Sequence, residues 1–405
     1  MILHIAVFVH VFLEVRKMTI GMKLGLVISF GLLIRVILFS YISNETVEYL
    51  SDRIEVMSIF TSFRRISEGR FLVSIGMDPY SSNYFRLNPI LSSLFFPFIQ
   101  NTLITYMMLV ICDLLATCVI AATLDSYTIP AAAMFFLNPY AILSELGLSG
   151  QSAHILVMSL LLFSVVKGGK TGLSTLWLGF LIILKPVVPL ALVFPIAVIL
   201  KRSVMKIIAL TICWILVIVV LSFVTSGSWS FLSKSLLDPI LVSPDLEPNM
   251  GFAWCLFSMM FPASLPLFRI VFHLHLFVLM YPVYLRFSKS QEPCLHNRFL
   301  TLTMAAVILF QLYPTCIDYC MFFALMFACS PRYHDKISTL LSQTVIAGLA
   351  FTSVTGPLWI ERNMGNGNFL FVLSIVTTFL GTVAVGHSLT IARLEGYLVQ
   401  DKKSQ

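Results

Sequence analysis

Acidic side chains in polar segments are the first candidates for chemistry in this sequence. Asp52, Glu55, Glu68 and Asp78 lie in the polar segment 43–88, which follows the first long apolar run. A multispan glycosyltransferase needs an acid at such a place, as a catalytic base or as a metal ligand. No two of the four acids are adjacent or form an Asp-x-Asp pair, so we interpret Asp52, Glu55 and Glu68 as the solvated face of a helix.

Histidine and glycine motifs provide no second catalytic centre. His273 and His275 stand two residues apart in an apolar run, so they point to different faces of a helix and are expected to pack rather than to share a metal. The sequence has no His-Glu-x-x-His, no Gly-x-Ser-x-Gly and no glycine-rich phosphate loop. A Cys-His nucleophile pair stays open as an alternative, although no Cys lies near a predicted lumenal His; we predict no catalytic residue, no metal site and no cofactor.

The polar stretch 226–251 is the longest turn-rich interruption in the last two thirds of the chain. Its segment SPDLEPN places Asp245 and Glu247 between Pro244 and Pro248. Proline removes a backbone donor and restricts the residue before it, so this segment should hold a defined extended or turned shape. A stiff acidic loop is a candidate docking or ligand-binding element, and a solvated connector is the alternative interpretation.

Three further polar breaks interrupt the apolar runs. The first, at 138–151, contains Glu145 and Gln151; the second, at 313–318, ends on Asp318; the third, at 357–368, is rich in glycine and asparagine. A carboxylate at a membrane edge is a functional candidate, and amide side chains both donate and accept hydrogen bonds. Gathered at one edge of a helix bundle, these groups would suit a ligand with a glycan head and lipid tails.

The polar breaks must be held in place by a bundle of apolar helices, and the amino-acid composition predicts such a bundle. Of the 405 residues, 58% are hydrophobic and 11% are charged, and the mean hydropathy is +0.94. Soluble domains carry about 25% charged residues, so we predict an all-α polytopic membrane protein with a single membrane domain, 1–405. The net charge of +7 is interpreted as basic cytosolic loops rather than as a nucleic-acid surface.

Basic clusters indicate the topology. If all of them are cytosolic, each apolar interval crosses the membrane twice and the polar breaks face the lumen, which gives about 12 transmembrane or half-inserted helices with both termini cytosolic. The runs 172–184 and 187–200 are too short to span alone, so we predict broken helices on either side of Lys185-Pro186. The clusters are Lys167/Lys170, Lys201/Arg202/Lys206, Arg286/Lys289/Arg298, Arg332/Lys336 and Arg393/Lys402/Lys403.

The first part of the chain contains an extension, 1–19, whose status is left open, and a first span at about 20–42. Arg35 in this span should face protein or reach toward an interface. An apolar stripe at helical spacing then predicts a lumenal amphipathic helix lying on the membrane. The stripe consists of Ile54, Met57, Phe60, Phe63 and Ile66.

Two short signals concern processing and location. Asn44-Glu45-Thr46 is a formal glycosylation acceptor next to the end of the first span. The tail 394–405 ends in Lys402-Lys403-Ser404-Gln405, the di-lysine pattern for retrieval to the endoplasmic reticulum.

Several segments, in order along the chain, are similar to one known family. They include IRVILF at 34–39, SDRIEVMSIFTSFRRISEG at 51–69, GMDPYSSNYFRLNP at 76–89, LNPYAILS at 137–144, YPTCID at 313–318 and GNGNF at 365–369. The longest is SWSFLSKSLLDPILVSPDLEPNMGFAW at 228–254. Together they resemble the PIG-U family, the multispan subunit of the glycosylphosphatidylinositol (GPI) transamidase.

The resemblance implies an architecture like that of the multispan (GT-C-like) glycosyltransferases without their acidic catalytic loop. It implies a non-catalytic subunit in the endoplasmic-reticulum membrane that helps to bind and present the GPI lipid. The implied partners are the caspase-like catalytic subunit PIG-K, PIG-T, PIG-S and an exopeptidase-like subunit. Carried over residue by residue, the candidate contacts to lipid or partners are Pro244, Asp245, Pro248, Asn249, Asp318, Asn366 and Asn368.

Two other functions are open at this stage. One is a lumenal mannosyltransferase that uses a dolichol-linked donor, with Asp52 or Asp78 as the base. The other is a transporter or scramblase, for which broken helices are expected. The absence of paired acids in segment 43–88 favours the transamidase subunit.

Overall fold

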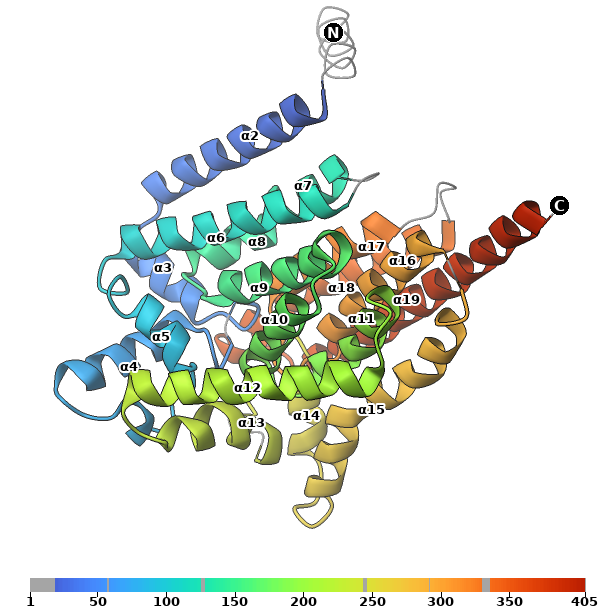
Figure 1. The fold of residues 1–405 in the computed structure, drawn as a ribbon. Coiled ribbons are helices and arrows are strands. Elements are labelled where there is room, and N and C mark those ends of the chain that lie inside the picture. Colours follow the sequence, from blue (N-terminus) through green and yellow to red (C-terminus); the bar gives the residue numbers. More distant parts are fainter. Residues whose placement is uncertain are drawn as a thin grey trace, which may run out of the picture.

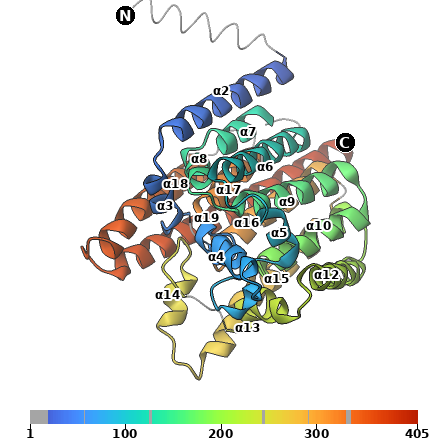
Figure 2. The same ribbon diagram turned by 90° about the vertical axis from the view of Figure 1, so that its left-hand side faces the viewer.

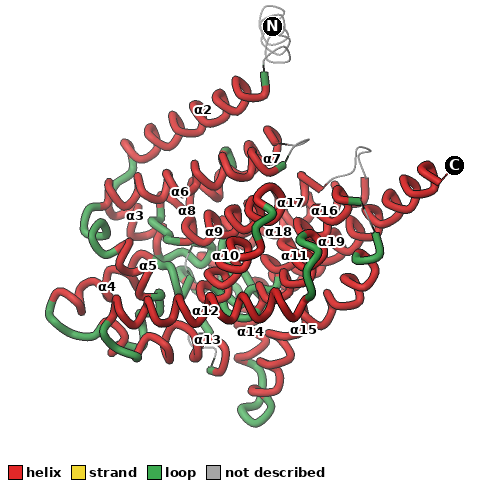
Figure 3. Tube along the Cα trace, in the orientation of Figure 1, coloured by secondary structure: helices red, strands yellow, loops and turns green. Residues whose placement is uncertain are grey.

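The computed structural model describes residues 19–56, 58–124, 128–242, 246–290, 292–329 and 336–404, and every regular element in these ranges is a helix (Figures 1 and 3). The predicted all-α class is therefore confirmed. The main helices are α2 (Ile20–Tyr41), α6 (Thr102–Thr123), α7 (Thr128–Phe136), α9 (Gln151–Phe163), α10 (Thr171–Leu184), α12 (Val204–Ser226), α15 (Leu265–Phe287), α16 (Pro293–Leu309), α17 (Cys316–Cys329), α18 (Lys336–Ile360) and α19 (Gly367–Ser404).

Short helices fill the connections between them. They are α3 (Asn44–Ser51), α4 (Phe63–Ser74), η1 (Pro79–Ser81), α5 (Pro89–Phe95), α8 (Pro139–Leu146), η2 (Ser164–Gly168), η3 (Val188–Leu192), α11 (Val193–Ile199), η4 (Leu232–Leu237), α13 (Asp238–Leu241) and α14 (Ala253–Ser258). The predicted extension 1–19 lies outside the described residues except for Thr19, which caps the N-terminus of α2.

Within the described ranges, seven helices are long and apolar enough to cross a membrane, and the bent pair formed by α7 and α8 makes an eighth. The two members of that pair meet at 42°, on either side of Asn138. The finding confirms a polytopic membrane protein. Four shorter apolar segments lie at 171–184, 188–199, 293–309 and 316–329.

The short helices α16 and α17 form the interior of the bundle. Nearly all of their residues are buried, and the other helices surround them in both ribbon views (Figures 1 and 2). A helix that packs on protein along its length does not need to match the thickness of the bilayer. By contrast, α2 and α12 expose most of their apolar side chains at the outside of the bundle, as lipid-facing helices do.

The predicted break at Lys185-Pro186 is confirmed. Helix α10 ends at Leu184, and η3 with α11 continues the chain after Pro186. Proline cannot donate to the preceding turn, and Val187 takes a left-handed φ of 71°, so the helix cannot pass through this point. The break brings Lys185 into the interior at a helix end.

The predicted amphipathic surface helix is wrong in its extent and its setting. The chain forms α3 and α4 with turns between them, and the stripe residues Ile54, Phe60 and Ile66 are buried while Phe63 is half-buried. Met57 lies outside the described residues. Helical spacing correctly identified residues that avoid water, but these side chains pack inside the protein rather than into lipid.

The physical reason lies in the backbone of these turns. The Glu55 carbonyl accepts from Cys316 N at 2.7 Å, and the Thr61 carbonyl accepts from Gly150 N at 2.9 Å. Ser149 Oγ donates to the Val56 carbonyl at 3.2 Å. These carbonyls are bonded to distant segments, so tertiary hydrogen bonds replace those that a continuous helix would make within itself.

Candidate functional site

The centre of the molecule holds a buried polar group of five residues, which we call the Asp318 cluster: Asp318, Lys185, Gln151, His154 and Thr315. Lys185 Nζ donates to Asp318 Oδ2 at 2.8 Å, and Gln151 Nε2 donates to Oδ1 at 2.9 Å. His154 Nδ1 lies 3.4 Å from Oδ1. The backbone N–H and the hydroxyl of Thr315 donate to Oδ2 at 2.8 and 3.0 Å. All five side chains are buried.

Three helix ends place these residues. Thr315 and Asp318 precede and open α17 with the spacing of a capping box, in which the side chain at the third helical position reaches back to the cap N–H. Gln151 opens α9, and Lys185 follows the broken end of α10. Because the three ends converge on one carboxylate, the cluster fixes α9, α10 and α17 relative to one another.

The interpretation of Asp318 as a lone acid at the membrane edge is therefore wrong. Its carboxylate is completely buried, is paired with Lys185 and accepts hydrogen bonds on both oxygens. A carboxylate in this state is not free to act as a base, because a buried charge is tolerated only when its partners satisfy it. Its hydrogen bonds join the start of α9, the end of α10 and the start of α17.

The turns between α3 and α4 form one side of this centre. Thr61 Oγ1 donates to Gln151 Oε1 at 3.1 Å. Arg53 Nε donates to Glu55 Oε1 at 2.7 Å, and Arg53 Nη2 donates to the Ser353 carbonyl of α18 at 2.7 Å. Glu55 is completely buried, so its interpretation as a solvated helix face is wrong. The part of the first polar segment around Glu55 and Thr61 is thus packed inside the fold.

The stretch 226–251 reaches the same centre from another side. Pro314 approaches the backbone of Gly251 so closely that a Cβ at Gly251 would lie 2.8 Å from Pro314 Cδ. The Asn249 side chain accepts from Gly251 N at 2.8 Å, which shapes the turn. Asn249 is buried in this turn, so its observed contacts are structural. The stretch contains η4 and α13 rather than loop alone.

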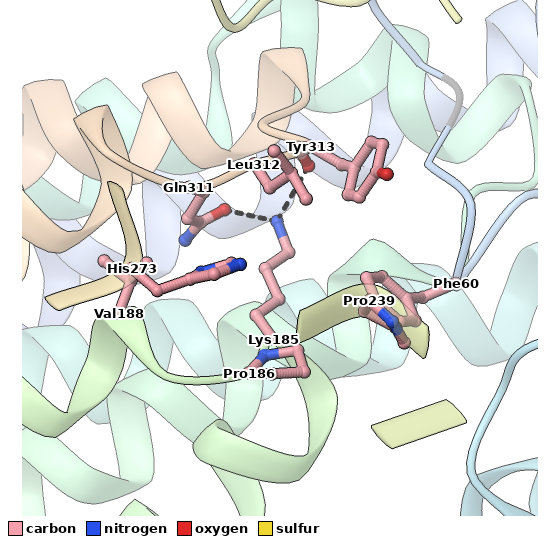
Figure 4. Close-up of a pocket in the computed structure, with 9 residues that line it drawn as sticks. All are labelled: Phe60, Lys185, Pro186, Val188, Pro239, His273, Gln311, Leu312 and Tyr313. Atoms are coloured by element: carbon pink, nitrogen blue, oxygen red, sulfur yellow. Dashed lines mark hydrogen bonds between the residues drawn. The ribbon is translucent and has the colours of Figure 1, made fainter. Parts of the chain in front are cut away.

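A narrow pocket opens beside the Asp318 cluster (Figure 4). Lys185 Nζ donates to the side-chain oxygen of Gln311 and, at 3.3 Å, to the Tyr313 carbonyl, so Lys185 is shared between the cluster and the pocket. The pocket is lined by Phe60, Lys185, Pro186, Val188, Pro239, His273, Gln311, Leu312 and Tyr313. Segments on both sides of the Lys185-Pro186 break, the 226–251 stretch and the 313–318 break therefore meet at one place.

The structure places the remaining predicted contacts differently. Pro244 and Asp245 lie outside the described residues, and Pro248 is half-buried. Asn366 and Asn368 are exposed in the turn that joins α18 to α19, where Asn366 Oδ1 accepts from Asn368 N at 3.0 Å. Residues 402 and 403 lie in the last turns of α19, and their side chains lie outside the described part.

The asparagine turn is connected to the 226–251 stretch through aromatic side chains. Trp254, just after that stretch, stacks on Trp359 at a centroid distance of 6.3 Å. A Cβ at Gly367 would lie 2.9 Å from the Trp359 ring, so this glycine allows the ring to pack against the turn. The turn that holds the exposed Asn366 and Asn368 is therefore connected, through Trp359 and Trp254, to the end of the 226–251 stretch.

Two other acids of the first polar segment, Asp52 and Asp78, have partners of their own. Asp52 forms an exposed ion pair with Arg64 at 3.1 Å. Asp78 caps η1 and accepts from Ser228 Oγ at 3.2 Å and from Ser230 Oγ. Burial, together with the nearby Asp78 carboxylate, raises the pKa of the Tyr80 phenol above its usual range. These contacts connect segment 78–88 to the 226–251 stretch and present no paired acids.

A second buried polar group lies between α2, α6 and α8. Arg35 Nε donates to Glu145 Oε2 at 2.6 Å, and Arg35 Nη1 donates to the Phe136 carbonyl at 2.9 Å. The Asp113 carboxyl group is buried near them. Of the two alternatives predicted for Arg35, the structure shows the first, because its side chain faces protein and is buried.

Lys185, His154 and Gln311 were not predicted as site residues. The available signal was the cost of an ionisable residue between apolar runs, which makes Lys185 a functional candidate by default. Its pairing with Asp318, 133 positions later, had no local signal in the sequence. Among the residues that the structure covers, no group of three His, Cys, Asp or Glu side chains has the arrangement of a metal site.

These features define a class: a polytopic, all-helical membrane protein whose broken helices enclose a buried ion pair beside a narrow pocket. Comparison with known proteins identifies the family. A sequence model described as "GPI transamidase subunit PIG-U" matches residues 29–377, so this chain belongs to the PIG-U family.

Individual relatives are similar over most of their length. The mouse and human proteins named "GPI-anchor transamidase component PIGU" are each 26% identical, over 402 and 403 residues, and each alignment covers 87% of this chain and 89% of the relative. The Saccharomyces cerevisiae protein named "GPI transamidase component GAB1" is 25% identical over 365 residues, with 86% and 89% covered.

Proposed function

We propose that this protein is a subunit of the GPI transamidase. The match of the PIG-U family across residues 29–377 carries this proposal, and the mouse, human and yeast relatives named as transamidase components support it. Within the complex the chain is a non-catalytic component, and the thiol nucleophile belongs to the caspase-like subunit PIG-K. The absence of paired acids in segment 43–88 and the fully bonded Asp318 support this division of labour.

The chain helps to bind and present the GPI lipid and to hold the partners PIG-K, PIG-T, PIG-S and the exopeptidase-like subunit. The exposed Asn366 and Asn368, the half-buried Pro248 and the unplaced Pro244 and Asp245 are its proposed contacts with lipid or partners. The buried Asn249 and Asp318 act through the shape of the surrounding segments. The Lys185-Pro186 break, the 226–251 stretch and the 313–318 break meet at one pocket, which supports a single binding region.

The protein lies in the endoplasmic-reticulum membrane as one domain with both termini cytosolic. We propose about 12 transmembrane or half-inserted helices in an architecture like that of the GT-C glycosyltransferases, and the seven long apolar helices, the bent pair and the four shorter apolar helices support this number. The polar breaks then face the lumen, and Lys402 and Lys403 form the proposed retrieval signal on the cytosolic side. An epitope tag inserted beside Asn366 should be protected in sealed microsomes; labelling from the cytosolic side would contradict this topology.

Loss of this protein in cells is expected to produce two effects together. Complete GPI lipids and unprocessed precursor proteins should both accumulate, because lipid synthesis continues while attachment stops. Lipid extraction with thin-layer chromatography and immunoblotting of a GPI-anchored reporter measure the two effects, and re-expression of the full chain is the control. Accumulation of a truncated glycolipid that lacks a mannose would contradict the proposal and support a mannosyltransferase.

A further inference from the structure

We infer that the pocket beside Lys185 binds one hydroxyl group of a polyol headgroup, such as a sugar or inositol ring on a lipid. This inference rests on the proposed function and specifies the chemistry of its lipid contact. Figure 4 shows the side chains of His273, Gln311 and Lys185 converging on the pocket from three separate elements.

Two side chains of the pocket carry unused hydrogen-bonding atoms. His273 is 4% exposed and Gln311 is 3% exposed. The His273 ring lies against the backbone of Pro239, but neither ring nitrogen makes a hydrogen bond of normal geometry with the described residues, and the same holds for Gln311 Nε2. Buried polar atoms are nearly always paired in folded proteins, so atoms left unpaired in a pocket indicate a missing ligand or water.

The unused atoms have the chemistry that a hydroxyl group requires. A neutral imidazole offers one donor and one acceptor, and an amide nitrogen donates. A hydroxyl donates one hydrogen bond and accepts two, so it can donate to the His273 ring and accept from Gln311 Nε2. The Gln311 oxygen is already bonded to Lys185, which leaves the amide nitrogen as the group available to a ligand.

The local charge disfavours a phosphate at this position. Lys185 Nζ lies 2.8 Å from Asp318 Oδ2, so its charge is already balanced inside the protein. A phosphate in the pocket would lie close to the Asp318 carboxylate. Lys185 is already paired with Asp318 and could not balance a second negative charge, and like charges in a poorly solvated site repel strongly. An uncharged hydroxyl avoids this cost.

The dimensions of the pocket limit the ligand to a single group. Its free space is on the scale of one water molecule, which admits a hydroxyl but not a sugar ring. Apolar and aromatic residues form the walls, and Phe60 and Tyr313 make an edge-to-face pair with centroids 6.1 Å apart. A polyol ring that inserts one hydroxyl would rest its apolar face on such walls.

Photo-crosslinking to the purified full-length protein tests this inference. A diazirine analogue of phosphatidylinositol is the probe, and excess phosphatidylinositol or phosphatidylserine competes with it. The two competitors have the same net charge, but only the first has ring hydroxyls. Wild-type protein should prefer phosphatidylinositol by about tenfold, the effect of one or two net hydrogen bonds.

Two variants remove the hydrogen-bonding groups that the pocket offers to a ligand and keep side chains of similar size. His273→Phe keeps the ring and loses both nitrogens, and Gln311→Glu keeps the oxygen that bonds Lys185 and loses the donor. In both variants the preference for phosphatidylinositol should disappear, so that the two lipids compete about equally. His275→Phe, on the same helix but outside the pocket lining, is the matched control and should keep the wild-type preference.

The outcomes separate this inference from the proposed function. A preference that persists in both variants, or that is absent from wild-type protein, would show that the pocket holds water only and would overturn the inference while lipid binding stands. If wild-type protein were not photolabelled at all, the lipid-binding part of the proposed function would fail as well.

Discussion

Asp318→Ala is expected to destabilise the folded protein by about 3–5 kcal/mol, because it leaves the buried Lys185 ammonium without its counter-charge. The substitution also removes the acceptor for the Thr315 N–H and for the Gln151 amide. Each buried donor that loses its partner adds its own desolvation cost. Thermal or denaturant unfolding of the purified protein in detergent micelles measures the loss.

A double-mutant cycle shows whether the ion pair is the cause. Lys185→Met alone should cost a similar amount, whereas the double variant Lys185→Met/Asp318→Ala should cost clearly less than the sum of the two single changes. Glu395→Ala is the matched control, since it breaks the partly exposed pair with Arg298 and should cost less than about 1 kcal/mol. Additive single effects would show that Asp318 and Lys185 are not coupled.

The parts of the fold that were predictable from sequence follow from solvent preference and from proline chemistry. Long apolar runs predicted the helices, and Lys185-Pro186 predicted the break between α10 and η3. The burial of Arg35 followed from the cost of placing a guanidinium in lipid. Each of these inferences needed only one residue or one run and its immediate surroundings.

The parts that were not predictable depend on pairings between distant segments. The spacing of Ile54, Phe60 and Ile66 indicated a helix, but periodicity does not report that Gly150 and Cys316 bond the backbone of these turns. The helical preference of this segment was outweighed by tertiary hydrogen bonds, which leave no recognisable pattern in the sequence.

The candidate site was predictable only in part for the same reason. Asp318 was selected because it is an acid near a membrane edge, yet its partners Lys185 and Gln151 come from two other helix ends. The prolines and polar residues of the breaks identified which segments converge. They did not identify His273 and Gln311, whose unused atoms become visible only when the pocket is formed.

The second large effect is expected at Arg35, which connects α2 to the rest of the bundle. Only 11% of the apolar stretch of α2 is buried, so few of its apolar side chains pack against the rest of the protein. Arg35 supplies the ion pair with Glu145, a bond to the Phe136 carbonyl and a guanidinium 3.9 Å from the Phe136 ring centroid. Arg35→Leu should therefore destabilise the protein by about 3–5 kcal/mol and loosen α2.

Asp113→Asn shows whether the effect of Arg35→Leu comes from the loss of the cation or from any substitution in this buried group. Asp113 and Glu145 are two buried carboxyl groups beside the single guanidinium of Arg35, so an uncharged amide at position 113 relieves an excess of acid. It should cost less than about 1 kcal/mol or even stabilise the fold. Arg35→Leu removes the only cation in this group and should have a much larger effect.

Leu33→Ala provides the matched control on the same helix, because Leu33 is 56% exposed on the outer face of α2. It should change the stability in detergent by less than about 1 kcal/mol, since little buried area is lost. Equal unfolding midpoints for Arg35→Leu and Leu33→Ala would mean that the ion pair does not anchor α2. A large loss for Arg35→Leu alone would show that one buried guanidinium, more than apolar packing, holds the first described span against the bundle.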